Sequence, residues 1–314
     1  MSKPSMTVSE NPNDYQSWYN QGLRFTEVGQ YREALIAFTR ALKLKPNSYQ
    51  AWNNRGNILK QLGYARTALT AFEQALSLNP KSHLIWYNLG NTYRELERYH
   101  EAITAFEKVV ELKANFYQAW NNKGQCLSNL GRYQEAIEAY DYALTIQPNL
   151  YKTWYYRGNA FRDLGFPEQA ILSYDKALGI KPNAYEAWYD RGQALFDLGQ
   201  LEDELASYEE AIILKRNFYD AWNSRGKVMI ALQRWKEAID SFDQALAIQL
   251  DNGEAFYNKA TCYALQGDLE SALLNLERAL IFSPKRCRER AKADSAFDKM
   301  RSHYQFQQLI DTQD

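Results

Sequence analysis

The sequence predicts an all-α fold in which helix-turn-helix units stack along the chain as a solenoid, with further helices capping its C-terminal end. Tryptophan recurs every 34 residues, and a fixed period of this length decides the architecture of a chain. Within each period, apolar and small residues follow a helical spacing. Glycine and proline separate these stretches, so each period reads as two short helices.

The period defines eight copies of one unit across residues 15–286. Glycine follows the tryptophan after four residues, and an alanine and an aromatic residue recur later in the unit. The eighth copy replaces the tryptophan with Phe256 and the glycine with Ala260. The tryptophans are Trp18, Trp52, Trp86, Trp120, Trp154, Trp188 and Trp222. The predicted repeats are 15–48, 49–82, 83–116, 117–150, 151–184, 185–218, 219–252 and 253–286, after a flexible lead at 1–14.

Residues 49–82 illustrate how one repeat is expected to fold. Residues 49–62 form the first helix, and Gly63 ends it, because glycine readily adopts the left-handed conformation of a helix C-terminus. The second helix follows and stops before a proline, such as Pro80. Six of the eight copies have glycine at the turn: Gly29, Gly63, Gly131, Gly165, Gly199 and Gly267.

The recurring small residues predict a close contact between the two helices of each repeat. We expect the glycine of the first helix to face the alanine of the second, with the tryptophan and the later aromatic residue filling the space around them. Repeat 6 departs from this pattern, because Glu204 replaces the alanine opposite Gly192. A buried carboxylate must reach solvent, pair with Arg191 or Arg225, or widen the helix pair. We interpret it as a structural adjustment and predict that Glu204→Ala raises the melting temperature.

The pattern W-x2-x-G-x2-[YFL], followed by A-x3-[FY] and a proline, resembles the tetratricopeptide repeat (TPR) family over about nine tenths of the chain. The resemblance implies a right-handed superhelix of stacked helix pairs, in which the first helix of every pair lines a concave groove. It also implies a function in binding other proteins.

The segment 287–314 is predicted to cap the last repeat, since a solenoid otherwise exposes an apolar face. Residues 285–293 read as a charged helix, and Asp294 is a suitable N-cap for the next helical segment. The remaining apolar side chains suggest two short helical turns folded back on this cap: Phe297, Met300, Tyr304, Phe306, Leu309 and Ile310. This ending resembles that of many cyanobacterial TPR proteins.

Composition disfavours several functional classes. The net charge of -1 provides no basic surface for nucleic acid, and no apolar run is long enough for membrane insertion or for a signal peptide. These observations favour a cytoplasmic protein. Cys126 and Cys262 occupy equivalent repeat positions and are expected to be packing residues. Neither His nor Cys spacing suggests a metal site, and there is no phosphate-binding loop or nucleophile elbow. We therefore expect no enzyme activity, no metal and no cofactor.

The expected binding site is a row of amide and phenol side chains along the first helices. Asparagine both donates and accepts hydrogen bonds, so a row of it can bind the backbone of an extended peptide, and tyrosine adds apolar contact. The row resembles the asparagine ladder of O-GlcNAc transferase TPR domains. The lysines of the chaperone-binding TPR subclass are missing, which disfavours binding to heat-shock protein C-termini. The expected groove residues are Tyr19, Asn20, Asn53, Asn54, Asn57, Tyr87, Asn88, Asn91, Asn121, Asn122, Gln125, Tyr155, Asn159, Tyr189, Asp190 and Asp197.

The later repeats are predicted to be more acidic and more apolar on this face than the earlier ones. The acidic residues suggest that a partner has a basic segment near repeats 5 to 7. Phe196 and Leu265 suggest either an anchor site or a seat for the chain's own tail. We therefore expect an adaptor that binds protein or peptide partners. The alternatives are a self-associating structural protein, an assembly factor for a photosystem or other complex, and the regulatory arm of an enzyme complex.

Overall fold

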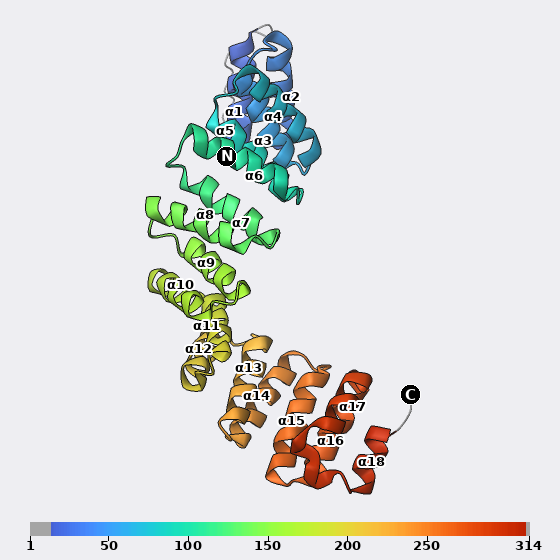
Figure 1. Ribbon diagram of the computed structural model, residues 1–314. Helices are drawn as coiled ribbons and strands as arrows, with labels where there is room; N and C mark the ends of the chain where they lie inside the picture. Colours follow the sequence, from blue (N-terminus) through green and yellow to red (C-terminus); the bar gives the residue numbers. More distant parts are fainter. Residues whose placement is uncertain (1–13, 312–314) are drawn as a thin grey trace, which may run out of the picture. The chain divides into compact units, whose positions relative to one another are not determined.

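A computed structural model describes residues 14–311, and these residues are helical throughout, with short turns and no strand. The chain divides into two compact units after Ala160, and each is described by itself. Helix α9 (Tyr151–Asp163) crosses this division. In Figure 1 the first unit runs from blue to green and the second from yellow-green to red. The predicted all-α fold of consecutive helix pairs is confirmed.

The first unit consists of four helical hairpins and the start of α9. Within each hairpin the first helix packs against the second, and the second helix also packs against the first helix of the next hairpin. The first helices begin 34 residues apart, as the sequence period predicts. The helices are α1 (Tyr15–Glu27), α2 (Tyr31–Leu44), α3 (Tyr49–Gln61), α4 (Ala65–Leu78), α5 (His83–Glu95), α6 (Tyr99–Leu112), α7 (Tyr117–Asn129) and α8 (Tyr133–Ile146).

The second unit continues the same arrangement and ends in the predicted cap. Three hairpins pack in sequence, and α10 packs against the first of them. The helices are α10 (Pro167–Ile180), α11 (Tyr185–Asp197), α12 (Leu201–Leu214), α13 (Tyr219–Ala231), α14 (Trp235–Ile248), α15 (Gly253–Gln266), α16 (Leu269–Phe282), α17 (Pro284–Ala293) and α18 (Tyr304–Asp311). A 3-10 helix, η1 (Ser295–Met300), lies between α17 and α18.

The turns inside the hairpins have the left-handed conformation that the sequence predicts. All six turn glycines have positive φ angles, between 66° and 84°. Repeats 3 and 7 place Glu97 and Gln233 at the same position, with φ angles of 58° and 59°. At the other end of the helix, Asp14 caps α1 by accepting hydrogen bonds from the backbone N–H groups of Gln16 and Ser17. Of the predicted lead at 1–14, Asp14 alone lies within the described residues.

The predicted contact between glycine and alanine is wrong, because the repeat glycines of repeats 1 to 4, 6 and 7 pack against the aromatic ring instead. A Cβ atom added to Gly56 would lie 2.6 Å from Cε1 of Phe72, and Gly124 has the same relation to Tyr140 at 2.5 Å. The alanine is buried next to the ring, but it is the ring that requires the glycine. In the eighth repeat a larger residue, Ala260, replaces the glycine, and a smaller one, Leu276, replaces the aromatic ring. Both are fully buried.

The tryptophans are half-buried rather than central to the core. In repeats 2 to 7 the repeat tryptophan donates a hydrogen bond from its indole Nε1–H to the backbone carbonyl six residues earlier, as Trp52 does to Pro46 at 2.8 Å. That carbonyl belongs to the turn between repeats. The same bond recurs in the repeats of Trp86, Trp120, Trp154, Trp188 and Trp222. The tryptophan therefore holds the loop that enters its own repeat.

A recurring cation before the repeat glycine links neighbouring repeats. Arg225 on α13 pairs with Glu209 on α12 at 3.0 Å and donates to Ser241 Oγ on α14 at 2.6 Å. Arg191 and Lys123 pair with an acidic residue at the equivalent position of the preceding helix. Arg55 is the exception, because its buried Nε has no hydrogen-bond partner among residues 14–311. The position that should supply the carboxylate holds Thr39.

Glu204, at the start of α12, is only 2% exposed, and its Oε2 atom has no hydrogen-bond partner among the described residues. It neither reaches solvent nor pairs with the two expected cations, since Arg191 binds Asp175 and Arg225 binds Glu209. Burial raises the pKa of Glu204 to about 7, and a hydrogen bond with Tyr208 only partly opposes this shift. Below neutral pH the buried carboxyl is therefore mostly protonated.

The C-terminal segment forms part of the core of the last hairpin. Phe297 and Phe306 are fully buried and stack on each other, and Phe297 also packs against Tyr257 of α15. Asp294 caps η1 by accepting a hydrogen bond from Ala296, as predicted, and it also accepts one from the Tyr257 hydroxyl. Tyr304 differs from the prediction, because it is 69% exposed.

We expect Gly56→Ala to destabilise the first unit by about 1–3 kcal/mol, because the added methyl group overlaps the Phe72 ring. Adding Phe72→Leu should recover part of this loss by recreating the pair formed by Ala260 and Leu276. Gly179→Ala is the control, since that helical glycine has nothing within 4 Å of the added atom. Chemical denaturation would measure all three. Equal effects of Gly56→Ala and Gly179→Ala would refute the ring contact.

We expect Thr39→Asp to stabilise the chain by about 0.5–1 kcal/mol, because the new carboxylate would pair with Arg55 as Glu209 pairs with Arg225. Thr39→Asn is the neutral control of similar shape. The gain should decrease with added salt and disappear in an Arg55→Met background. A gain that persists with Arg55→Met would show that the stabilisation does not come from this ion pair.

Glu204 should make stability fall as the pH rises. The folded-state pKa of about 7 lies above the ordinary value of 4.5, so the unfolded chain loses the proton first. The contribution of the protonated carboxyl to the free energy of unfolding is therefore fully present below pH 4.5. It decreases by about 3 kcal/mol as the pH rises from 4.5 to 7. Glu204→Gln and Glu204→Ala should accordingly raise the melting temperature more at pH 8 than at pH 5. Exposed Glu202→Gln is the control, and a lower melting temperature of both Glu204 variants at pH 8 would contradict this account.

Candidate functional site

The expected groove residues lie on the first helices of the repeats, from Tyr19 on α1 to Asp197 on α11. In each unit, we call the face of the first helices that carries these residues the ladder face. Asn20 and Asp197 are exposed, Asn122 is buried, and the other expected residues are half-buried. In the first unit this face is lined by amide and phenol groups.

Hydrogen bonds run along the ladder face from each repeat to the preceding one. Asn54 donates from Nδ2 to the Tyr19 hydroxyl at 3.0 Å, and Asn88 donates to Asn53 Oδ1 at 2.9 Å. Asn122 donates to the Tyr87 hydroxyl at 3.2 Å. The alternation of tyrosine and asparagine at the accepting position thus has a structural reason, because either side chain supplies an oxygen there.

Asn122 is the most connected residue of this row. Besides Tyr87, it donates to Asn91 Oδ1 at 2.9 Å and accepts from Asn121 and from Arg94, each at 3.2 Å. Arg94 also donates to Gln125 Oε1 at 3.0 Å. This network commits most of the polar atoms near Asn122 to the protein itself.

The amide side chains on α1, α3 and α5 have more atoms that make no hydrogen bond within residues 14–311. The Oδ1 atoms of Asn54 and Asn88 accept no hydrogen bond from residues 14–311, although their Nδ2 groups are engaged. Asn57 is half-buried, and Asn20 is exposed. Asn53 and Asn91 show the opposite pattern, because their Oδ1 atoms accept hydrogen bonds from the following repeat and their Nδ2 groups donate none within residues 14–311. The ladder face of the first unit therefore presents both oxygen acceptors and amide donors, on side chains that are already held in place by their other amide atom.

The remaining expected residues lie near the division between the units and in the second unit. Tyr155 and Asn159 are half-buried on α9, and Tyr155 packs beside Tyr156. Asp190 pairs with Arg162 at 2.6 Å, so much of its charge is neutralised. Tyr189 packs against Tyr208 and Phe218. Among the expected acidic residues, Asp197 keeps its charge exposed to solvent.

A cavity of about 350 Å³ opens on the ladder face of the second unit. Tyr189, one of the expected groove residues, lines it, but the sequence predicted neither the cavity nor the participation of Glu204 and Asn223. Phe196, proposed as an anchor for a partner or for the tail, is 62% exposed at this cavity. The tail itself packs on α15 and α16, where Phe297 and Phe306 join the core of the last hairpin.

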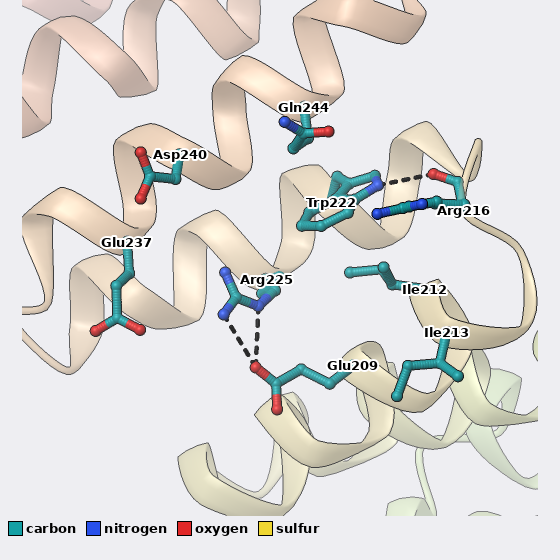
Figure 2. A pocket seen from close by; sticks show the side chains of 9 residues that line it. All are labelled: Glu209, Ile212, Ile213, Arg216, Trp222, Arg225, Glu237, Asp240 and Gln244. Carbon is teal, nitrogen blue, oxygen red and sulfur yellow. Dashed lines mark hydrogen bonds and ion pairs between the residues drawn. The ribbon is translucent and has the colours of Figure 1, made fainter.

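A second depression, of about 810 Å³, involves α12, α13 and α14 and was not predicted (Figure 2). Its polar side chains largely serve the fold. Arg225 points at Glu209, and the Trp222 indole bonds to the carbonyl of Arg216. Ile213 is 72% exposed beside them. In the sequence, the signal for this depression is Ile213, an apolar residue at an exposed position of a second helix.

The cysteines have no feature of reactive residues. Cys126 and Cys262 are fully buried, as predicted, and burial raises the pKa of their thiols to about 11 and about 12. The described part of the chain contains no group of three or more His, Cys, Asp or Glu side chains placed to hold a metal ion. Among the helices of residues 14–311, none has the length and hydropathy needed to cross a bilayer.

Several solved structures share this arrangement of helix pairs. YrrB, described as a TPR protein with an unusual peptide-binding site, is 22% identical over 60% of this chain and 97% of its own, with a TM-score of 0.54. A TPR protein from Parabacteroides merdae ATCC 43184 is 18% identical over 78% of this chain and 97% of its own, with a TM-score of 0.58. MamA from Desulfovibrio magneticus RS-1 is 20% identical over 56% of this chain and 99% of its own, with a TM-score of 0.53. These similarities establish the fold.

A search of curated proteins finds no match to the sequence. Two family models do match, and together they span most of the chain. The model described as tetratricopeptide repeat matches residues 59–115, 87–150, 155–221 and 223–286, and the model described as TPR repeat matches residues 22–63. The chain therefore belongs to the tetratricopeptide repeat family.

Proposed function

We propose that this protein is a non-catalytic scaffold or adaptor that binds extended segments of partner proteins on its ladder face. The observation that supports this most directly is the row of amide groups with unused atoms: acceptors on Asn54 and Asn88, and donors on Asn53 and Asn91. An extended peptide carries a regular series of N–H donors and C=O acceptors, which such a row can bind without demanding particular side chains. The description of YrrB as a protein with a peptide-binding site agrees with this use of the fold.

The internal hydrogen bonds of the ladder favour binding. Asn54 and Asn88 are held by their Nδ2 groups, so their rotamers are fixed before a peptide arrives. Binding then costs less side-chain entropy than it would with freely rotating amides. The same geometry explains the half-buried state of these residues without making them inaccessible.

Self-association through exchange of the C-terminal tail has less support. Phe297 and Phe306 are fully buried within their own chain, where they complete the core of the last hairpin. Releasing them would expose a large apolar surface. Assembly of a photosystem or other complex, or the regulation of an enzyme supplied by another chain, would use the same ladder face and are settings for the adaptor function.

We expect peptides selected by display on the intact chain to bind the ladder face. Asn20→Arg combined with Asn57→Arg should weaken them by about tenfold or more, because both changes fill this face without removing a hydrogen bond between repeats. Ile36→Arg is the control, since Ile36 is 55% exposed on the second helix α2. Titration calorimetry would compare the affinities.

The opposite pattern would overturn the proposal. It fails if the selected peptides bind the ladder variant as tightly as the native chain, or if Ile36→Arg alone abolishes binding. It also fails if display on the intact chain yields no binding peptide. Removing Asn54, Asn88 and Asn122 together is a poorer test, because their Nδ2 groups link successive repeats and the change would weaken the fold itself.

A further inference from the structure

The cavity of about 350 Å³ in the second unit is lined from four helices: α11, α12, α13 and the start of α15. Its aromatic side chains include Tyr189, Tyr208, Tyr219 and exposed Phe196. Its volume suits one long side chain rather than a folded partner. It opens on the ladder face, where we propose that extended peptides lie.

Two buried acceptors in this cavity have no partner within the described residues. Glu204 is 2% exposed and its Oε2 is unpaired, while Asn223 is 8% exposed and its Oδ1 is unpaired. A buried acceptor that has lost its water and gained no partner destabilises the fold, so a ligand that supplies a donor to it is favoured. The hydroxyl of Tyr208 hydrogen-bonds Glu204, and it accepts a hydrogen bond from Gln193 Nε2 at 2.6 Å. This network positions the carboxyl but leaves its second oxygen available.

The charge of the cavity complements a cation. Asp220 and Glu254 join Glu204 in lining it. Lys227 also lines it, and its ammonium is already paired with Glu254 at 2.7 Å. The aromatic rings offer faces on which a cation is attracted by the π electrons. Unsatisfied acceptors, carboxylates and aromatic rings together are the features that a guanidinium or an ammonium group requires.

We propose that this cavity binds a basic side chain, arginine or lysine, of a peptide on the ladder face, with the Glu204 carboxylate and the Asn223 carbonyl as its hydrogen-bond acceptors. This inference rests on the proposed function and adds a specific anchor to it. It also gives Glu204, whose buried Oε2 has no partner within residues 14–311, a role that an alanine could not fill. The sequence predicted that a partner has a basic segment near repeats 5 to 7, and this cavity is a specific place where such a segment could bind.

Binding at this cavity should be coupled to a proton. The groups that face Glu204 are Tyr208 on α12, Asp197 on α11, and Tyr219, Asp220 and Lys227 on α13, with Glu254 on α15. Burial raises the pKa of Glu204 to about 7, so the free protein holds the proton below neutral pH. A cation favours the carboxylate and therefore displaces that proton. Affinity should rise by about tenfold between pH 6 and pH 8, as the ionised fraction rises.

The probe is the peptide acetyl-Gly-Gly-Arg-Gly-Gly-amide, titrated into the intact chain labelled with nitrogen-15. Matched peptides carry lysine or citrulline, the latter being the neutral analogue of arginine. We expect the arginine or the lysine peptide to shift the side-chain amide signals of Asn223 and Gln193. The affinity obtained from these shifts should be higher at pH 8 than at pH 6. The citrulline peptide should cause no saturable shift.

Two variants test the role of the carboxyl. Glu204→Gln should remove both the binding and its pH dependence, while Glu202→Gln, an exposed change on the same helix, should leave both intact. Circular dichroism would show that each variant is folded. The inference is wrong if citrulline binds as tightly as arginine, if Glu204→Gln binds as the native chain does, or if neither basic peptide binds. Display-selected peptides that still bind the ladder face in that case would show that the anchor fails and the proposed function stands.

Discussion

The contact between a glycine and an aromatic ring is the interaction on which each hairpin depends. Because Gly56 has no side chain, the ring of Phe72 lies directly against the backbone of α3, and the two helices approach closely. The repeat period transmits this geometry along the array, since the position of each hairpin sets where the next first helix can pack. Ala260 and Leu276 show that the requirement concerns combined volume, because a larger residue on one helix is matched by a smaller one on the other.

Polar side chains then join one hairpin to the next, and they do so on two different sides of the first helix. The cation before the repeat glycine binds the preceding second helix, as Arg225 binds Glu209. In repeat 4, where Lys123 pairs with Glu107 in this way, the asparagine beside the cation binds the preceding first helix, because Asn122 donates to the Tyr87 hydroxyl. A single turn of helix thus carries both links. The amide row is consequently part of the scaffold, and its capacity to bind a peptide lies in the amide oxygen and nitrogen atoms that these hydrogen bonds do not use.

The sequence was sufficient to predict features that depend on backbone conformation and on period. The left-handed turn at Gly63 and the N-cap at Asp294 follow from local chemistry, and both are present. The sequence was insufficient to predict a contact for which two residues, both distant along the chain, are possible partners. Glycine was paired with alanine because both are small, whereas the ring of Phe72 occupies the space that glycine leaves. The partner of the repeat arginine was likewise missed, since it lies sixteen residues earlier, on the preceding helix.

Glu204 shows why an exception to a repeat is more informative than the repeat itself. The other seven repeats fill the equivalent position with alanine, so the fold has no need of a carboxyl there. From the sequence alone, a packing adjustment was the simpler interpretation, because the expected cations were close in the chain. The structure pairs those cations elsewhere and leaves the carboxyl buried, with its pKa raised to about 7. The residue lines a cavity that holds a second unsatisfied acceptor. A residue that destabilises its own hairpin in this way is retained most simply if a ligand supplies the missing partner.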